Sequence, residues 1–255
     1  MLRLLTVLSF LLLSALPVRA EEVVAGLSQN RVSITATFVG SEILIFGAVK
    51  RDSPPPEDNP LEVVVVVEGP SAPITVRKKD KRFGIWVNTE AMELAAAPSF
   101  YAVASSAPLE QSVSTLDDLR HLISVERSIK ISENPFNIDD PREFVDALIR
   151  IRQKSGLYKL LESSVTLQKD TLFETRVALP ANLTEGEYRT RILLTRGGEV
   201  TSEYETVINV QKVGLERWIF NLAHEKPLIY GLLSLVIAIA AGWGASAAFR
   251  MILRN

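Results

Sequence analysis

The sequence lacks cysteine entirely and contains only two histidines among its 255 residues. A chain without thiols forms no disulfide and offers neither a thiolate ligand nor a thiol nucleophile. The two histidines, His121 and His224, stand too far apart in the sequence for a zinc-ligand spacing. Glycine-rich phosphate loops and the nucleophile-elbow pattern are missing as well. The sequence therefore predicts no cofactor, no metal site and no enzyme activity.

Positive charge is scarce between the two ends of the chain. Residues 21–226 carry 24 Lys and Arg against 30 Asp and Glu, because four of the 28 cations lie in the terminal segments. A domain with a net charge of −6 does not favour nucleic acid or anionic lipid as its partner, since both attract basic surfaces. A hydrophobic share of 47% nevertheless indicates a folded domain.

A hydrophobic segment stands near the N-terminus. Residues 4–16 form an uncharged, leucine-rich run that follows Arg3 and precedes a short stretch ending at Ala20. This is the order of a secretory signal with cleavage after Ala20. Such a run rises only about 20 Å as a helix, short of the roughly 30 Å hydrocarbon core. We therefore expect residues 1–20 to be a signal peptide.

The second hydrophobic segment, residues 227–249, contains no charged side chain. A segment of 23 residues is long enough to span a bilayer with some tilt. Arg250 and Arg254 follow it in the short tail 250–255, and this excess of cations favours a cytoplasmic tail. The sequence thus predicts one transmembrane helix, with residues 21–226 on the opposite side of the membrane.

Small residues recur along this span at intervals of three and four positions: Ala238, Ala241, Gly242 and Ala245. Such a face allows the backbone of another helix to approach closely. Small residues are also common in membrane spans generally, so helix packing and an ordinary lipid-facing surface are both open.

The segment before residue 112 and the segment after residue 160 show the period of β-strands. Apolar and polar residues alternate over Arg31–Phe38 and again after Ile43, which predicts a hairpin with one buried face. The unbroken run Val63–Val67 predicts a central strand covered on both faces. A break is expected at Lys78–Lys81. Further short strands are expected at Ile74–Arg77, Phe83–Val87, Phe100–Ala104, Val165–Leu167 and Leu172–Val177.

These patterns predict a mainly β fold, an antiparallel Ig-like β-sandwich with a helical insertion at about residues 115–156. Two arrangements remain open. Residues 21–226 form either one domain or two smaller sub-domains over 21–112 and 160–212.

The stronger helix of the insertion begins at Asp140. This N-cap residue is followed by Pro141 at the first helical position and by Glu143 at the reciprocal capping site, and about 15 helical residues follow. A shorter helix opens at Thr115, with an expected buried side made of Leu116, Leu119 and either Leu122 or Ile123. The neighbouring carboxylates at both helix starts are interpreted as caps, since neither pair has the spacing of a calcium loop.

The last hairpin turns at Gly197 and Gly198. A two-residue loop would set Ile192 opposite Glu203, whereas a three-residue loop sets Ile192 opposite Tyr204 and keeps apolar side chains on one face. Because a slip of one residue moves the whole apolar set, the sequence predicts the three-residue loop.

One basic cluster stands out, with five cations among the six residues 77–82: Arg77, Lys78, Lys79, Lys81 and Arg82. A solvated turn between two strands is the ordinary explanation. The alternative is docking to an anionic partner or binding of a small anion. The cluster holds no aromatic residue, which argues against single-stranded nucleic acid.

The order of these segments resembles that of a transmembrane protein family of alphaproteobacteria. The resemblance covers nearly the whole chain and rests on the hairpin of Val32–Val49 with its Gly47, the strands Gly84–Asn88 and Phe100–Ser106, the loop Pro180–Tyr188 and the C-terminal span. It implies a periplasmic domain anchored in the inner membrane of a Gram-negative envelope, with no assigned activity. It also implies genes that lie beside integral-membrane anion exporters of the sulfite type.

Three functions follow as hypotheses. The first is a noncatalytic, membrane-anchored periplasmic interaction or accessory protein, with a membrane or envelope protein such as a sulfite-type anion exporter as partner. The second is a solute- or anion-sensing subunit that uses the basic cluster. The third is a hydrolase whose carboxylates meet only in the folded chain.

Overall fold

The computed structural model describes residues 21–35, 38–51, 59–132, 140–213 and 215–252. The expected signal peptide, Asp139 and the end of the tail lie outside these residues. The chain divides into two units, which are described separately. The first comprises residues up to Val32 together with Val39–Val210, and the second comprises Ser33–Phe38 and Gln211–Asn255.

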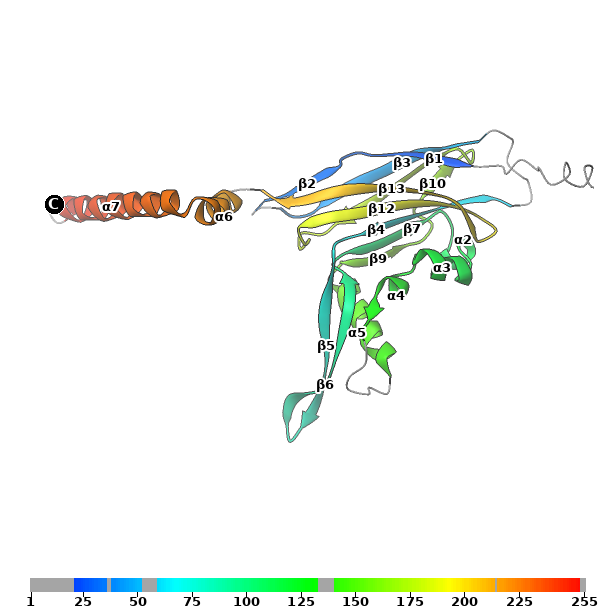
Figure 1. The fold of residues 1–255 in the computed structure, drawn as a ribbon, viewed down its shortest axis with the longest axis horizontal. Helices are drawn as coiled ribbons and strands as arrows, with labels where there is room; N and C mark the ends of the chain where they lie inside the picture. The colour runs from blue at the N-terminus through cyan, green and yellow to red at the C-terminus, as the bar shows by residue number, and fades with distance from the viewer. Residues whose placement is uncertain (1–20, 36–37, 52–58, 133–139, 214, 253–255) are drawn as a thin grey trace, which may run out of the picture. The chain divides into compact units, whose positions relative to one another are not determined.

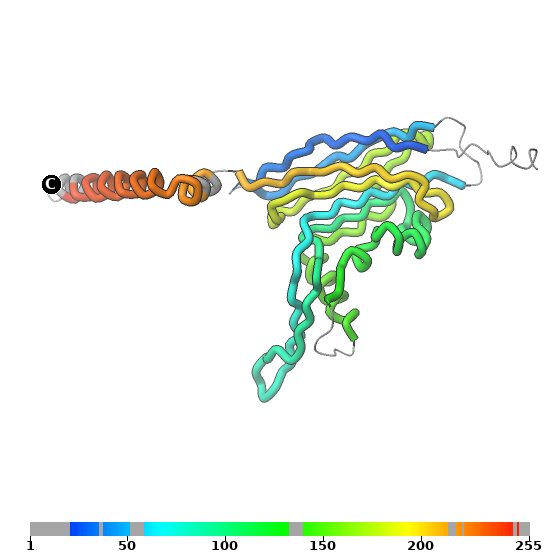
Figure 2. Tube along the Cα trace, viewed as in Figure 1, coloured from blue at the N-terminus to red at the C-terminus, as the bar shows by residue number. Residues whose placement is uncertain are grey.

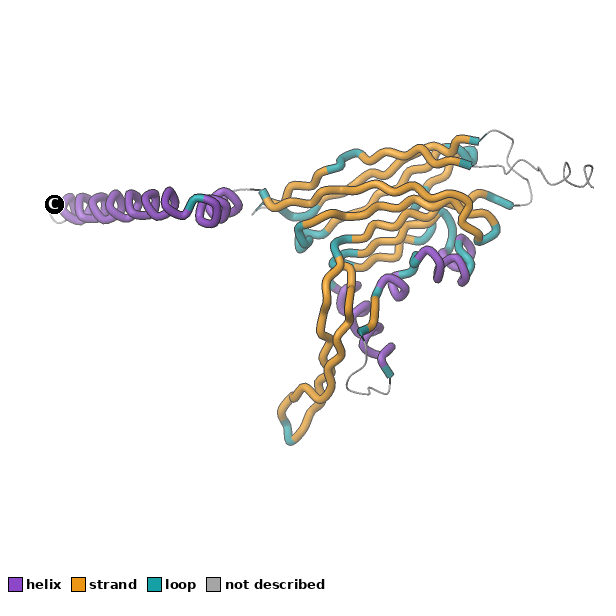
Figure 3. The backbone as a smooth tube through the Cα atoms, in the orientation of Figure 1, coloured by secondary structure: helices purple, strands orange, loops and turns teal. Residues whose placement is uncertain are grey.

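Strands dominate the first unit, as the sequence predicts (Figures 1 and 3). One sheet has six strands in the order β2 (Arg31–Ile34), β13 (Glu199–Lys212), β12 (Gly186–Arg196), β4 (Leu61–Glu68), β7 (Tyr101–Ser105) and β9 (Tyr158–Leu161). A second has four strands in the order β1 (Glu22–Leu27), β3 (Ser41–Lys50), β11 (Leu172–Leu179) and β10 (Thr166–Gln168). A third consists of β5 (Ser71–Arg82), β6 (Ile85–Pro98) and β8 (Lys130–Ile131). The hairpin expected over Arg31–Val49 is wrong, because β2 pairs with β13 whereas β3 pairs with β1 and β11 in another sheet.

The helical segment lies between β7 and β9. It contains α2 (Leu109–Ser112), α3 (Thr115–His121), α4 (Val125–Ser128) and α5 (Pro141–Lys154). The pairings in the described part of the chain are antiparallel except β7 with β9, which is parallel. A parallel neighbour requires a long crossover, and the helices provide it.

Strand β4 is covered on both faces, which confirms the prediction made from its run of valines. All five residues of Val63–Val67 are at most 1% exposed. Val64 and Val66 belong to a core formed with α5, whose Phe144 and Leu148 are also buried in it. Strand β11 differs, because only every second residue is buried and the sheet therefore has one solvated face.

Helix α5 begins as predicted. The Asp140 carboxylate accepts a hydrogen bond from the backbone N of Arg142 at 3.0 Å, and Pro141 occupies the first position. Glu143 does not act as the reciprocal cap. Its carboxylate instead accepts a hydrogen bond from Lys78 Nζ at 2.8 Å.

The expected orientation of α3 is wrong. Ser114 rather than Thr115 caps this helix, and Leu116 and Leu119 are 64% and 53% exposed, while Ile123 just beyond it is buried. The buried Asp117 explains this, because its carboxylate accepts a hydrogen bond from Val200 N at 2.9 Å and turns the leucines outward.

The last hairpin has the predicted register but not the predicted loop. Ile192 faces Tyr204 and Arg191 faces Glu205. The turn nevertheless has two residues, Gly197 and Gly198, both with positive φ, and a bulge in the ladder restores the register beyond Leu194.

The second unit contains α6 (Leu215–Glu225) and α7 (Pro227–Ile252). In the described part of the chain, α7 is the one helix long and apolar enough to cross a membrane, with a mean hydropathy of 2.0 over Pro227–Ser246. The predicted transmembrane helix is therefore present as a helix.

Candidate functional site

The hairpin of β5 and β6 extends away from the six-stranded sheet (Figures 1 and 2). Its inner half belongs to the core, where Val76, Met92 and Leu94 are buried together with side chains of α5. From Arg77 outward to Glu90 most residues are exposed. We call residues 77–90 the arm.

The expected break at Lys78–Lys81 is wrong, because β5 continues through the basic cluster to Arg82. The arm is a two-stranded ribbon with solvent on both faces, so charged side chains are tolerated at every position of the strand. The cluster therefore forms one edge of an extended hairpin rather than a loop.

Two contacts hold the base of the arm. Lys78 donates a hydrogen bond to Glu143 of α5, and this bond raises the pKa of Lys78 above its ordinary value. Strand β8 pairs with the inner part of β6 at Leu94 and Ala96. The outer part carries no third strand in the described chain.

The tip of the arm is a two-residue turn with Phe83 and Gly84 in the left-handed region, at φ 50° and 87°. Such turns favour Asn-Gly, because a bulky side chain is disfavoured at positive φ. Phe83 is fully exposed, so no burial in the described chain offsets this strain. Strain retained at an exposed position points to a role for the side chain.

The register distributes the side chains of the tip over two faces. Lys81 lies opposite Trp86 and Lys79 opposite Asn88, so these four share one face, which holds no carboxylate. The other face combines Ile85 and Val87 with Arg82 and Asp80, which lie 3.7 Å apart as an ion pair. Trp86 is 68% and Ile85 is 66% exposed.

All five predicted site residues lie on β5, but they do not form a single patch. Lys78 is engaged by Glu143 and Arg82 by Asp80. Within the described residues, Lys79 and Lys81 make no ion pair through their side chains.

The sequence reasoning missed the apolar members of this site: Phe83, Ile85 and Trp86. The sequence offers one signal for these members of the site, namely three large apolar residues that stand beside a glycine and a run of cations. The same residues are equally typical of a half-buried strand, and only the structure distinguishes the two.

A pocket of about 760 Å³ lies among helices α2 to α5 and strands β7 and β9. Four carboxylates and one lysine contribute to its lining, together with apolar side chains: Glu110, Asp118, Glu126, Glu162 and Lys159. Asp118 accepts hydrogen bonds from Ser124, and Glu162 accepts one from Leu109 N at 2.9 Å. The described residues contain no group of three His, Asp or Glu placed to hold a metal.

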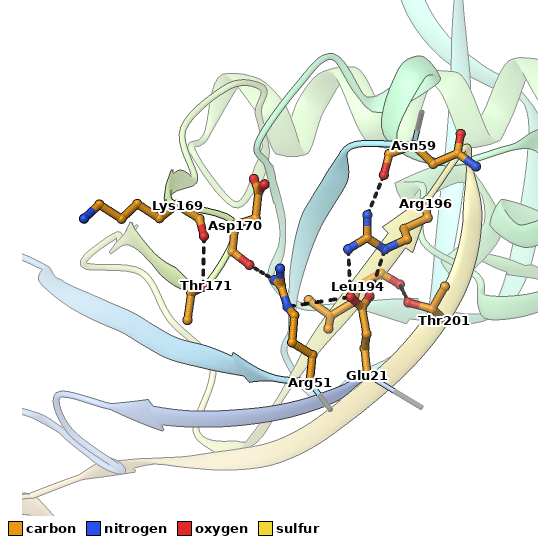
Figure 4. A network of polar contacts seen from close by, with 9 residues as sticks. All are labelled: Glu21, Arg51, Asn59, Lys169, Asp170, Thr171, Leu194, Arg196 and Thr201. Carbon is orange, nitrogen blue, oxygen red and sulfur yellow. Dashed lines mark hydrogen bonds and ion pairs between the residues drawn. The ribbon is translucent and has the colours of Figure 1, made fainter. Parts of the chain in front are cut away.

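A largely buried charge network joins Glu21 just before β1, Arg51 just after β3, and Arg196 of β12 (Figure 4). The Glu21 carboxylate accepts hydrogen bonds from Arg196 Nε and Nη2 at 3.0 and 2.7 Å, and Arg51 Nε lies 3.9 Å away. The two guanidinium groups also donate to the carbonyl oxygens of Asn59 and Asp170. This network is structural, since every charge has a protein partner.

The predicted packing residues Ala238, Ala241, Gly242 and Ala245 all lie on α7 and are exposed. A Cβ added to Gly242 would meet no atom within 4 Å in the described chain. Whether another helix packs there stays a prediction.

The comparison with known families confirms the resemblance noted in the sequence. Residues 22–251 match a family model described as "Putative transmembrane protein (Alph_Pro_TM)". A search of curated proteins finds no match to the chain. Because the family model covers most of the sequence, and because α7 fits a single membrane span, the chain belongs to this family of alphaproteobacterial transmembrane proteins.

Proposed function

We propose that this protein is a noncatalytic accessory protein of the bacterial inner membrane that makes its contacts through the arm. In this proposal α7 crosses the membrane once, the tail with Arg250 and Arg254 is cytoplasmic, and residues 21–226 form an Ig-like periplasmic domain. The observation that carries it is the exposed apolar tip of the arm, flanked by cations and held on a buried base.

The construction of the arm supports a contact role. An exposed hairpin that only connected β4 to β7 would need no apolar side chains at its end, and water disfavours them there. The tip instead exposes Phe83, Ile85 and Trp86 together. Aromatic residues are among the side chains most enriched where proteins meet their partners.

The anion-sensing alternative has less support. The basic side chains lie along both faces of an open ribbon, which encloses no volume for a small ion. The pocket has the opposite charge, with four carboxylates against Lys159. Such a lining repels anions, so the pocket and the basic cluster do not combine into one anion site.

The hydrolase alternative also has less support. General acid and base catalysis needs carboxylates that are free to exchange protons with a substrate. In the pocket, Asp118 and Glu162 accept hydrogen bonds from backbone N–H groups, which fixes them as structural acceptors.

Site-specific photocrosslinking of the full-length chain in cells tests the proposal. Benzoylphenylalanine at Trp86 on the arm should form adducts with lipid or with a membrane protein. The same group at Leu172, a position on β11 that is 55% exposed, is the matched control and should form few adducts. Equal labelling at the two positions would overturn the proposal.

A further inference from the structure

We propose that the tip of the arm inserts into the headgroup layer of an anionic bilayer, with Phe83, Ile85 and Trp86 as the inserting side chains. This inference rests on the proposed function of the arm as the contact element, and it names the surface that the arm contacts.

The chemistry of the tip matches this layer. Aromatic rings, tryptophan above all, favour the boundary between headgroups and acyl chains. Lysines beside them are attracted to anionic lipid and keep their charged ends in water while their stems cover apolar surface. Trp86 and Lys81 lie directly opposite on one face, and Lys79 follows on the same face.

The arrangement of the apolar residues favours a lipid surface over a protein surface. Ile85 and Trp86 are neighbours in a strand and therefore point to opposite faces of the ribbon, while Phe83 occupies the turn beyond them. A flat protein surface would cover one face and leave the other in water. A fluid headgroup layer surrounds the tip and covers both faces at once.

The strand pairings place the root of the arm at one end of the six-stranded sheet. Glu68, the last residue of β4, pairs with Arg189 near the start of β12, and Gly186 at that start pairs with Val210 near the end of β13. Strand β5, which leads into the arm, begins three residues after Glu68. The arm thus leaves the six-stranded sheet at the end where β4 stops and β12 starts.

The net negative charge of residues 21–226 does not determine the charge at the tip of the arm. The arm carries five cations against two carboxylates, Asp80 and Glu90. Its strands rise about 3.3 Å per residue, so Arg82 stands roughly 16 Å beyond Arg77 along the ribbon. This exceeds the screening length of about 8 Å at physiological salt, and a lipid surface at the tip therefore meets a basic field.

The test uses the full-length chain in lipid nanodiscs with Trp218→Phe and Trp243→Phe, so that Trp86 is the sole tryptophan. In nanodiscs that contain phosphatidylglycerol, Trp86 emission should shift to the blue and should be quenched by lipids brominated high on the acyl chain. In nanodiscs of phosphatidylcholine alone both effects should shrink several-fold.

Two sets of variants separate the contributions. The double variant Lys79→Gln and Lys81→Gln should give the same blue shift and quenching of Trp86 emission with and without anionic lipid. The double variant Phe83→Ser and Ile85→Ser should reduce quenching in both kinds of nanodisc. Lys154→Gln with Lys169→Gln, two exposed lysines away from the arm, is the matched control and should change neither.

A second probe covers the case in which the single-tryptophan chain folds poorly. Because the sequence has no cysteine, Phe83→Cys labelled with an environment-sensitive fluorophore reports on the tip in an otherwise unaltered chain. Water-like emission from both probes in every nanodisc would overturn the inference. If position 86 then still crosslinks to a membrane protein in cells, the proposed contact function stands and the lipid surface is wrong, whereas no adduct at all would overturn both.

Discussion

Arg191 of β12 donates hydrogen bonds to the carbonyl oxygen of His121 at 2.6 Å and to that of Leu122 at 3.1 Å. These carbonyl groups end helix α3, where the helix dipole favours a cation. The arginine is buried and also lies 3.7 Å from Glu203. One side chain therefore ties the helical segment to the six-stranded sheet.

Replacing this arginine should destabilise the domain strongly. Arg191→Ala should lower the free energy of unfolding by about 2–4 kcal/mol, because the carbonyl oxygens of His121 and Leu122 lose a charged donor and a buried side chain is removed. Arg191→Lys should retain only part of this stability, since an ammonium group lacks the planar fork that reaches two carbonyl groups. The control Arg189→Ala, on the same strand but exposed, should cost less than about 1 kcal/mol. Similar losses in urea unfolding of Arg191→Ala and Arg189→Ala would contradict this account.

The network around Glu21 gives a second comparison within adjacent residues. Glu21→Gln should cost about 3 kcal/mol, because the largely buried guanidinium groups of Arg196 and Arg51 lose the carboxylate that they share. Glu22→Gln should cost well under 1 kcal/mol, since its ion pair with Lys50 is exposed. Thermal unfolding of the two full-length variants in the same detergent measures the difference, and a larger loss for Glu22→Gln would show that the network is misread.

The cap of α5 allows a smaller test. Asp140→Ala should cost on the order of 1 kcal/mol, because the backbone N of Arg142 loses its acceptor. Asp146→Ala removes an exposed carboxylate from the helix interior and should be neutral or slightly stabilising, since alanine is the better helix former. Chemical denaturation distinguishes them, and equal losses would place the cap elsewhere.

Stability should fall at alkaline pH through buried tyrosines. Burial raises the pKa of Tyr158 from 10.0 to about 12, and burial also raises that of Tyr188. Because the unfolded chain ionises near pH 10 and the folded chain near pH 12, this stabilisation is complete below pH 10 and is lost as the pH rises toward 12.

Tyr158→Phe should have opposite effects at the two ends of this range. At pH 8 it should cost about 1 kcal/mol, because the hydroxyl no longer donates to the carbonyl oxygen of Pro98 at 2.7 Å. Between pH 10 and 12 the variant should lose roughly 2–3 kcal/mol less than the parent chain. Parallel curves of unfolding free energy against pH would exclude this role for Tyr158.

The proposed topology predicts where reporters are active. Alkaline phosphatase fused after Asn255 should be inactive, because the enzyme requires the oxidising periplasm. Protease added to spheroplasts should digest the region before Lys226. A protected domain with an active fusion would reverse the orientation, while the span itself would stand.

Local patterns predicted the parts of this fold whose physics is local. The run of valines makes both faces of β4 apolar, so both faces had to be buried. Asp140 and Pro141 likewise define the start of α5. The register of the last hairpin followed from keeping Ile192 and Tyr204 on one face, although the bulge that achieves it leaves no clear mark in the sequence.

The errors arose where a distant residue decides the outcome. Leu116 and Leu119 have the spacing of a buried face, but Asp117 is bonded to Val200 and turns them outward. Glu143 stands at a capping position, but its carboxylate accepts a hydrogen bond from Lys78, 65 residues earlier in the chain. The apolar tip was missed for a related reason, because periodicity cannot tell a strand in a sheet from a ribbon in solvent.

The arm and the pocket share helix α5. The base of the ribbon is buried against Phe144 and Leu148 on this helix, while Ile149 and Gln153 of the same helix line the pocket. The ribbon is fixed at its packed base, at Val76 and Leu94, and is free at Phe83. A force applied at Phe83 therefore tends to rotate the ribbon about this base. Mechanical load on the tip is therefore delivered as a torque to one wall of the pocket.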